Sequence, residues 1–80
     1  MSKTPGASAR YRLDRLRVRH LRLLEIVARE GSLGAAAREL GISQPAVTLL
    51  LRELEQVFEA VLVERDARGA RVTPQGHRAL

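Results

Sequence analysis

The sequence predicts a mainly α-helical domain, with a core of three helices, a two-stranded β-hairpin after it and the start of a further helix. Apolar residues recur at helical spacing between residues 21 and 58, and glycine, serine or threonine stands at the expected helix boundaries. From residue 60 the pattern changes to β-branched residues around a polar turn. A length of 80 residues allows one small domain, and 45% hydrophobic against 29% charged residues is typical of a folded chain.

The first expected helix follows a segment without hydrophobic periodicity. Residues 1–12 contain proline, glycine and small polar residues, and the helix is expected to start between residues 13 and 18. We therefore assign residues 1–17 to a flexible, basic N-terminal arm. Gly31 is expected to end the helix. The apolar stripe expected to face the core consists of Leu21, Leu24, Val27 and Ala28.

Two capped helices follow. Ser32 is a good N-cap for a short, alanine-rich helix over residues 33–40, and Gly41 suits the left-handed position after it. Ser43 caps a third helix over residues 44–58, with proline in its first turn, where the missing N–H is tolerated. The buried stripe expected on this third helix consists of Val47, Leu50, Leu51, Leu54 and Phe58.

A hairpin and the start of a last helix complete the chain. Residues 60–65 are expected to form a strand, residues 66–69 a turn and residues 70–72 the returning strand. Thr73 caps the last helix, and Pro74 occupies its first position.

The segment from residue 33 to residue 52 meets the local requirements of a helix-turn-helix. Ala37 is small where two helices cross closely, Gly41 tolerates the turn, and Val47 is apolar where the second helix packs back. Leu40, Ile42 and Leu50 fill the supporting apolar positions. With the hairpin, this predicts a winged helix-turn-helix domain over residues 18–73, followed at 74–80 by the start of a linker or dimerisation helix. The alternative is a plain helical hairpin in a small bundle.

The charge favours a polyanionic partner, although its distribution is uneven. The formal net charge is +5. Residues 1–22 carry seven Lys or Arg against one acid, whereas residues 23–80 carry seven Arg against eight acids. We therefore expect a nucleic-acid partner, with specificity supplied by the folded part. The alternative for the basic arm is that it only keeps the chain soluble.

Several short motifs in residues 21–80 resemble the N-terminal domain of LysR-type transcriptional regulators. These motifs are Glu30-Gly31-Ser32-Leu33, Ala36-Ala37, Leu40, Ser43-Gln44-Pro45-Ala46-Val47-Thr48, Leu54-Glu55, Leu62-Val63-Glu64-Arg65 and Val72-Thr73-Pro74-Gln75-Gly76. The resemblance implies a bacterial transcription factor that contacts DNA through the third helix and the wing. It also implies a homodimer through the helix starting at Pro74 and a larger effector-binding domain further on; the 80-residue piece itself is expected to be a monomer or weak dimer.

The chain departs from the family pattern at three places. The family usually carries glycine where this chain has Glu59 and a large aromatic where it has Val63, so we expect the junction between third helix and wing to be shaped differently. The run Thr48-Leu49-Leu50-Leu51 is more apolar than the usual Ser-Arg/Lys-Gln-Ile, which questions base contacts by Leu49 and Leu50.

The predicted interface with double-stranded DNA combines the third helix in the major groove with a basic wing. Gln44 is suited to adenine, Arg52 to guanine or phosphate, and both Leu49 and Pro45 to a thymine methyl group. The alternatives for Leu49 are a partner-protein contact or a weakly buried side chain. The alternative for Arg52 is an ion pair with Glu55, and that for Arg68 is a solvated charge in the turn. Serine caps can hold phosphates at helix starts, and wing arginines can contact phosphate or the minor groove. The predicted site comprises Ser32, Ser43, Gln44, Pro45, Thr48, Leu49, Arg52, Arg65, Arg68 and Arg71.

Other function classes find less support. His20 and His77 have no partner at catalytic or metal-ligand spacing and are expected at the surface, so we predict no enzyme, no metal, no cofactor and no small-molecule ligand. No apolar run is long enough for a membrane span, no signal peptide is evident, and cysteine is absent, which favours a soluble, intracellular chain. Together with the resemblance to LysR-type regulators, this implies the bacterial cytoplasm. A winged-helix protein-interaction module is the main alternative, and membrane-surface binding through the arm is a weaker one.

Overall fold

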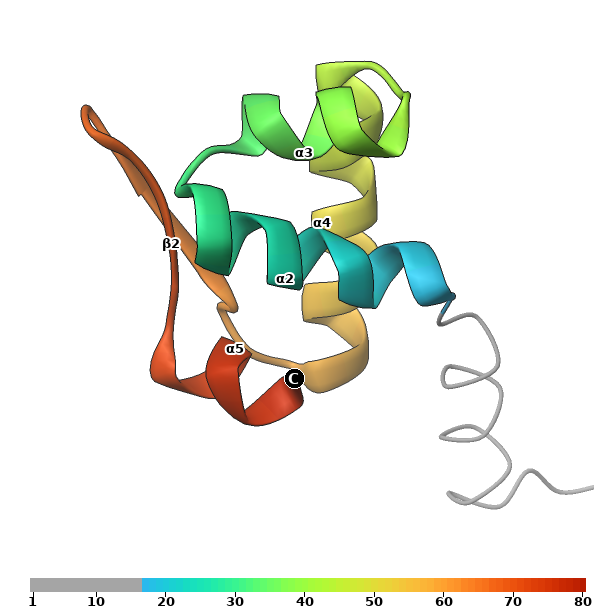
Figure 1. Cartoon of the computed structure of the whole chain (residues 1–80). Helices are drawn as coiled ribbons and strands as arrows, with labels where there is room; N and C mark the ends of the chain where they lie inside the picture. The colour runs from blue at the N-terminus through green and yellow to red at the C-terminus, as the bar shows by residue number, and fades with distance from the viewer. Residues whose placement is uncertain (1–16) are drawn as a thin grey trace, which may run out of the picture.

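The computed structural model describes residues 17–80, so the predicted arm lies, apart from Arg17, outside the described residues. The chain order is α2 (Val18–Glu30), α3 (Leu33–Leu40), α4 (Gln44–Phe58), β1 (Val63–Asp66), β2 (Gly69–Val72) and α5 (Pro74–Ala79). Helix α2 packs against α3, α4 and β2, so it lies at the centre of the domain, with the hairpin along one side (Figure 1). This is the predicted mainly helical fold with a two-stranded wing.

The core is formed by one face of each long helix together with the base of the hairpin. Leu23, Leu24, Ile26, Val27, Ala36, Val47, Leu54 and Leu62 are at most 2% exposed. The stripe predicted on α2 was therefore wrong in part, since Leu21 and Ala28 are exposed. Helix α2 turns the neighbouring face, which carries Leu23 and Ile26, toward α3 and α4.

The predicted helix ends of α2, α3 and α4 are confirmed. Gly31 and Gly41 follow α2 and α3 with φ of 70° and 68°, the left-handed conformation in which glycine carries no steric penalty. In the turn between α3 and α4, the Ile42 N–H donates to the Ala37 carbonyl over 3.0 Å. Ala37, Leu40, Ile42 and Leu50 are half-buried against the core, as the helix-turn-helix pattern requires.

Two expectations for the far end of α4 were wrong. Phe58 is 39% exposed rather than part of the buried stripe, because the chain leaves the helix there and turns toward the hairpin. Glu59 has φ 51° and ψ 45°, so it adopts the left-handed conformation favoured by glycine although it carries a side chain. At this junction Glu59 thus adopts the left-handed backbone conformation that a glycine would adopt.

The wing is a short antiparallel hairpin with Val63 opposite Val72 and Asp66 opposite Gly69. The first strand begins at Val63 rather than at residue 60, and the turn is shorter than the predicted 66–69. Beyond Val72 one more backbone hydrogen bond joins the two segments, from the Thr73 N–H to the Leu62 carbonyl over 2.9 Å. Thr73 also caps α5, because its hydroxyl accepts the Gly76 N–H over 3.0 Å. That hydroxyl also donates to the Val61 carbonyl over 2.7 Å, which holds the chain before β1 against the start of α5.

Candidate nucleic-acid interface

Helix α4 presents an outer face made of Gln44, Pro45, Thr48, Leu49 and Arg52. Thr48 is half-buried and the other four residues are exposed, with Leu49 56% exposed. The opposite side of the helix is buried through Val47, Leu51 and Leu54. Core packing therefore leaves this outer face at the surface.

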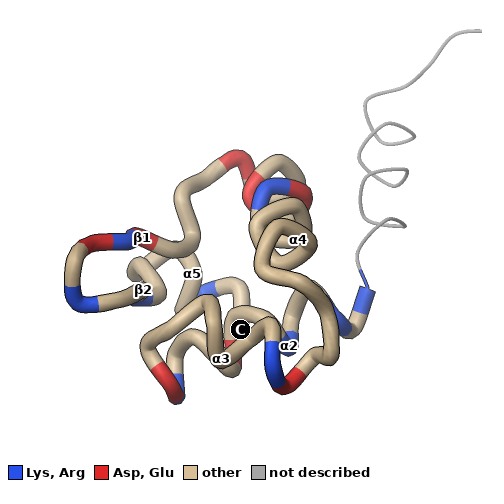
Figure 2. The backbone as a smooth tube through the Cα atoms, turned by 90° about the horizontal axis from the view of Figure 1, so that it is seen from above, with Lys and Arg blue, Asp and Glu red and all other residues tan. Residues whose placement is uncertain are grey.

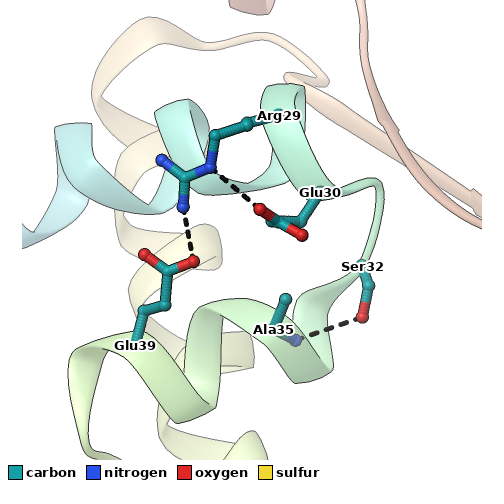
Figure 3. Close-up of polar contacts among 5 residues, drawn as sticks. All are labelled: Arg29, Glu30, Ser32, Ala35 and Glu39. Carbon is teal, nitrogen blue, oxygen red and sulfur yellow. Dashed lines mark hydrogen bonds and ion pairs between the residues drawn. The ribbon is translucent and has the colours of Figure 1, made fainter.

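The serines predicted to touch phosphate are helix caps. The Ser32 hydroxyl accepts the Ala35 N–H over 3.1 Å at the start of α3 (Figure 3). The Ser43 hydroxyl accepts the Ala46 N–H over 3.2 Å at the start of α4, and Ser43 is exposed. Each hydroxyl satisfies one free helix N–H and still has its own proton to donate.

The three predicted wing arginines differ in their contacts. Arg71 pairs with Asp66, with Nη2 and Oδ2 2.9 Å apart, and the other oxygen of Asp66 accepts the Arg68 N–H over 2.8 Å. The guanidinium groups of Arg65 and Arg68 make no ion pair with any described residue, and both residues are exposed. Both signs of charge therefore alternate along the hairpin (Figure 2), with Arg68 in its turn.

The wing is held in place by the turn between α2 and α3. The Ala70 N–H donates to the Gly31 carbonyl over 2.9 Å. Gly69, with φ 138°, lies so close to that carbonyl that a Cβ atom at this position would overlap its oxygen. The hairpin and the capped start of α3 are thus tied together by their backbones.

Comparison with known proteins identifies this arrangement. The family model described as bacterial regulatory helix-turn-helix protein, lysR family, matches residues 18–77. The chain belongs to the lysR family. This lysR-family domain is 47% identical over 67 residues to the regulator YdcI of Escherichia coli K12 and 52% identical over 58 residues to the regulator TfdS of Cupriavidus pinatubonensis. These matches cover 84% and 72% of the chain but only 22% and 20% of the relatives, so the chain spans about a fifth of their length.

Solved structures agree with the sequence comparison. The DNA-binding domain of CbnR in complex with DNA matches with a TM-score of 0.73 and 38% identity, over 81% of this chain and 75% of that one. The corresponding domain of BenM with benA site 1 DNA matches with a TM-score of 0.70 and 36% identity, over 80% of this chain and 74% of that one. The winged helix-turn-helix fold of this lysR-family domain is thus established.

A buried histidine, which we predicted at the surface, supports α4 from behind. His20 is 4% exposed. Its Nδ1 accepts the Arg17 N–H and its Nε2 lies 2.9 Å from Glu53 Oε1, so the ring bridges the start of α2 and the middle of α4. The other histidine, His77, is exposed as predicted. Helical spacing from Leu24 and Val27 places residue 20 on the buried face, a signal the sequence interpretation did not use.

The lysR-family domain also holds α3 against α2 with an ion pair that the sequence did not predict. Arg29 hydrogen-bonds to Glu39 of α3 and, over 2.9 Å, to Glu30 (Figure 3). The hydrogen bond to Glu39 and, to a smaller extent, the hydrogen bond to Glu30 raise the pKa of the Arg29 guanidinium above its ordinary value. The guanidinium is half-exposed, so the pair orients α3 more than it stabilises the fold.

Glu55 has a structural task that excludes the ion pair considered for Arg52. Its Oε2 accepts the Leu62 N–H over 2.8 Å and the Val63 N–H over 3.3 Å. The carboxylate therefore anchors the chain entering β1, and within residues 17–80 Arg52 makes no ion pair. Arg52 is left available on the outer face of α4.

The described part of the chain contains no helix long and apolar enough to cross a membrane. It also contains no cluster of three or more potential metal-binding side chains among histidine, cysteine, aspartate and glutamate.

Proposed function

We propose that this lysR-family domain binds double-stranded DNA sequence-specifically, as the DNA-binding part of a bacterial transcriptional regulator. The observation that carries the proposal is the outer face of α4, which is exposed along its first three turns while the other side of the helix is buried. A helix fits the major groove of B-DNA, and its N-terminal residues reach base edges. The similarity to CbnR and BenM domains crystallised with DNA supports the same role.

The residues of the outer face divide by chemistry. Gln44, at the first position of α4, carries the amide that can bond adenine N6 and N7 together. Pro45 and Thr48 offer van der Waals contact to base edges beside it. Arg52, two turns further and without an acidic partner among the described residues, reaches guanine or a phosphate. Residues 44–57 thus act as the recognition helix.

The backbone contacts come from helix starts and from the wing. Ser32 and Ser43 stand where free N–H groups and the helix dipole favour a phosphate. Arg65 and Arg68 have uncommitted charges and contact phosphates or the minor groove. Arg71 contributes less, because its guanidinium is already paired with the Asp66 carboxylate.

We further propose the division into a basic arm over 1–17, the DNA-binding domain over 18–73 and the beginning of a dimerisation helix over 74–80. A hollow of about 220 Å³ beside α5 is lined by Phe58, Ala60, Leu62, Gln75, Arg78 and Ala79. Phe58, which lines this hollow, is exposed, and so is Leu80, which directly follows Ala79 in the chain. This apolar surface supports a contact with a second copy of the chain. Six residues of α5 bury little area, so sedimentation of the 80-residue chain should give a monomer or weak dimer.

We propose that this role is regulatory rather than catalytic and that the protein acts at the nucleoid in the bacterial cytoplasm. The first test is fluorescence anisotropy with a random DNA duplex across a salt series. We expect binding at low salt. The logarithm of the association constant should fall linearly with the logarithm of the salt concentration, because Arg–phosphate contacts release counterions. Absence of binding even at low salt would refute the proposal and favour a protein partner on the exposed Leu49.

Variants separate the proposed roles. Arg65→Ala should weaken binding to all sequences alike and lower the salt slope by about one unit, whereas Arg71→Ala, the matched control in the same hairpin, should change the slope less. Gln44→Ala should cost about 1–3 kcal/mol at one base position only. Equal losses for Arg65→Ala and Gln44→Ala on random and on selected DNA would show that this division of roles is wrong.

A further inference from the structure

The outer face of α4 is uncharged until Arg52. Of the residues that precede it on this face, Gln44 and Thr48 are polar, whereas Pro45 and Leu49 have apolar side chains, and Leu49 is 56% exposed. Leu49 follows Pro45 by four residues, so the two lie one above the other on the helix surface, about 6 Å apart along its axis. They form an exposed apolar strip, Pro45–Leu49.

The chemistry of the major groove limits what this strip can contact favourably. Base edges there are hydrogen-bond donors and acceptors, and the one apolar group among them is the C5-methyl of thymine. A leucine placed against guanine, cytosine or adenine edges would desolvate polar atoms without pairing them, which costs free energy. Against a thymine methyl, the same side chain gains by removing apolar surface from water.

We propose that Leu49 contacts a thymine C5-methyl group and makes thymine the preferred base at that position of the target. The inference rests on the proposed binding of α4 in the major groove. Arg52 lies three residues further along the same face of α4.

The test uses the 80-residue chain and a duplex selected by it from a randomised library. Each thymine of the selected site is replaced singly by deoxyuridine, which removes only the methyl group. At one thymine we expect about fourfold weaker binding, which equals the roughly 0.8 kcal/mol assigned to one buried methyl or methylene group. At the same position, Leu49→Ala should bind the thymine and deoxyuridine duplexes equally well.

The control is Leu21→Ala, which removes another exposed leucine, on α2, and should keep the fourfold penalty. Circular dichroism checks that Leu49→Ala is folded, which is expected because an exposed helical site accepts alanine. If no thymine shows a penalty that depends on Leu49, the inference is wrong although DNA binding stands. If the wild-type chain binds no duplex at all, the proposed function itself fails and the inference with it.

Discussion

Replacing Gly69 by alanine tests whether the wing is held by the turn between α2 and α3. Gly69 begins β2 with φ 138°, a conformation that L side chains rarely adopt. An alanine Cβ would overlap the carbonyl oxygen of Gly31, which is a backbone atom and cannot swing aside. That same carbonyl accepts the Ala70 N–H over 2.9 Å, so relieving the overlap pulls the hairpin away from its hydrogen bond.

The size of the effect follows from two contributions. A residue held in a sparsely populated backbone region costs about 1–3 kcal/mol. The lost hydrogen bond contributes about 0.5–1.5 kcal/mol net. We therefore expect Gly69→Ala to lower the free energy of unfolding by about 2–4 kcal/mol. For an 80-residue chain the total is on the order of 4–12 kcal/mol, so the change is large.

Urea denaturation followed by circular dichroism measures this loss. The matched control is Gly34→Ala within α3, where the new Cβ would meet Ser32 Oγ at 3.4 Å and Arg38 Nη1 at 3.6 Å without a backbone overlap. This control should stabilise the domain by about 0.5–1 kcal/mol, because alanine replaces glycine in a helix. If Gly69→Ala and wild type unfold at the same urea concentration, the wing is not seated on Gly31 as described.

Three further substitutions probe the supports of the interface, and thermal or urea unfolding measures each of them. His20→Ala should lower the free energy of unfolding by about 2–4 kcal/mol, because it empties a buried site and removes the hydrogen bonds to Arg17 and Glu53. His77→Ala, at an exposed position, should change the free energy of unfolding little. Similar effects of the two substitutions would contradict burial of His20. Glu55→Ala should cost about 1–3 kcal/mol by leaving the Leu62 and Val63 N–H groups without their carboxylate, and a loss within about 0.5 kcal/mol would show that water replaces it. Gly76→Ala should cost about 1–3 kcal/mol or prevent folding, since its Cβ would overlap the Leu62 carbonyl and the Val72 side chain, and an unchanged midpoint would refute that packing.

The helix boundaries were predictable because their signals are local. Ser32, Ser43 and Thr73 each accept an N–H three residues ahead, so the cap and its partner lie within one turn of sequence. Gly31 and Gly41 are equally local, since their left-handed backbone ends the preceding helix without a distant contact. The outer face of α4 followed from the same logic, because its buried residues are regularly spaced.

Contacts between elements decided what the sequence left ambiguous. Helix α2 has leucine, isoleucine and valine on two adjoining faces, and packing against α3 and α4 also buries the face with Leu23. Burial of His20, by contrast, follows from its helical spacing to Leu24 and Val27. The start of β1 shifted to Val63 because Glu55 of α4 takes the N–H groups of Leu62 and Val63. Such partners lie seven or more residues apart, beyond the range of periodicity and caps.

The sequence by itself determined the order of helices and strands, the helix ends, the lysR-family resemblance and the candidate residues on α4 and the wing. Tertiary structure alone decided which wing arginine forms an ion pair, through the contact of Arg71 with Asp66 across the hairpin. It also decided where the wing sits, through the hydrogen bond between Ala70 and Gly31. The physical reason is range: caps and helical periods act within about one turn, whereas ion pairs and backbone contacts between elements form only after the chain has folded.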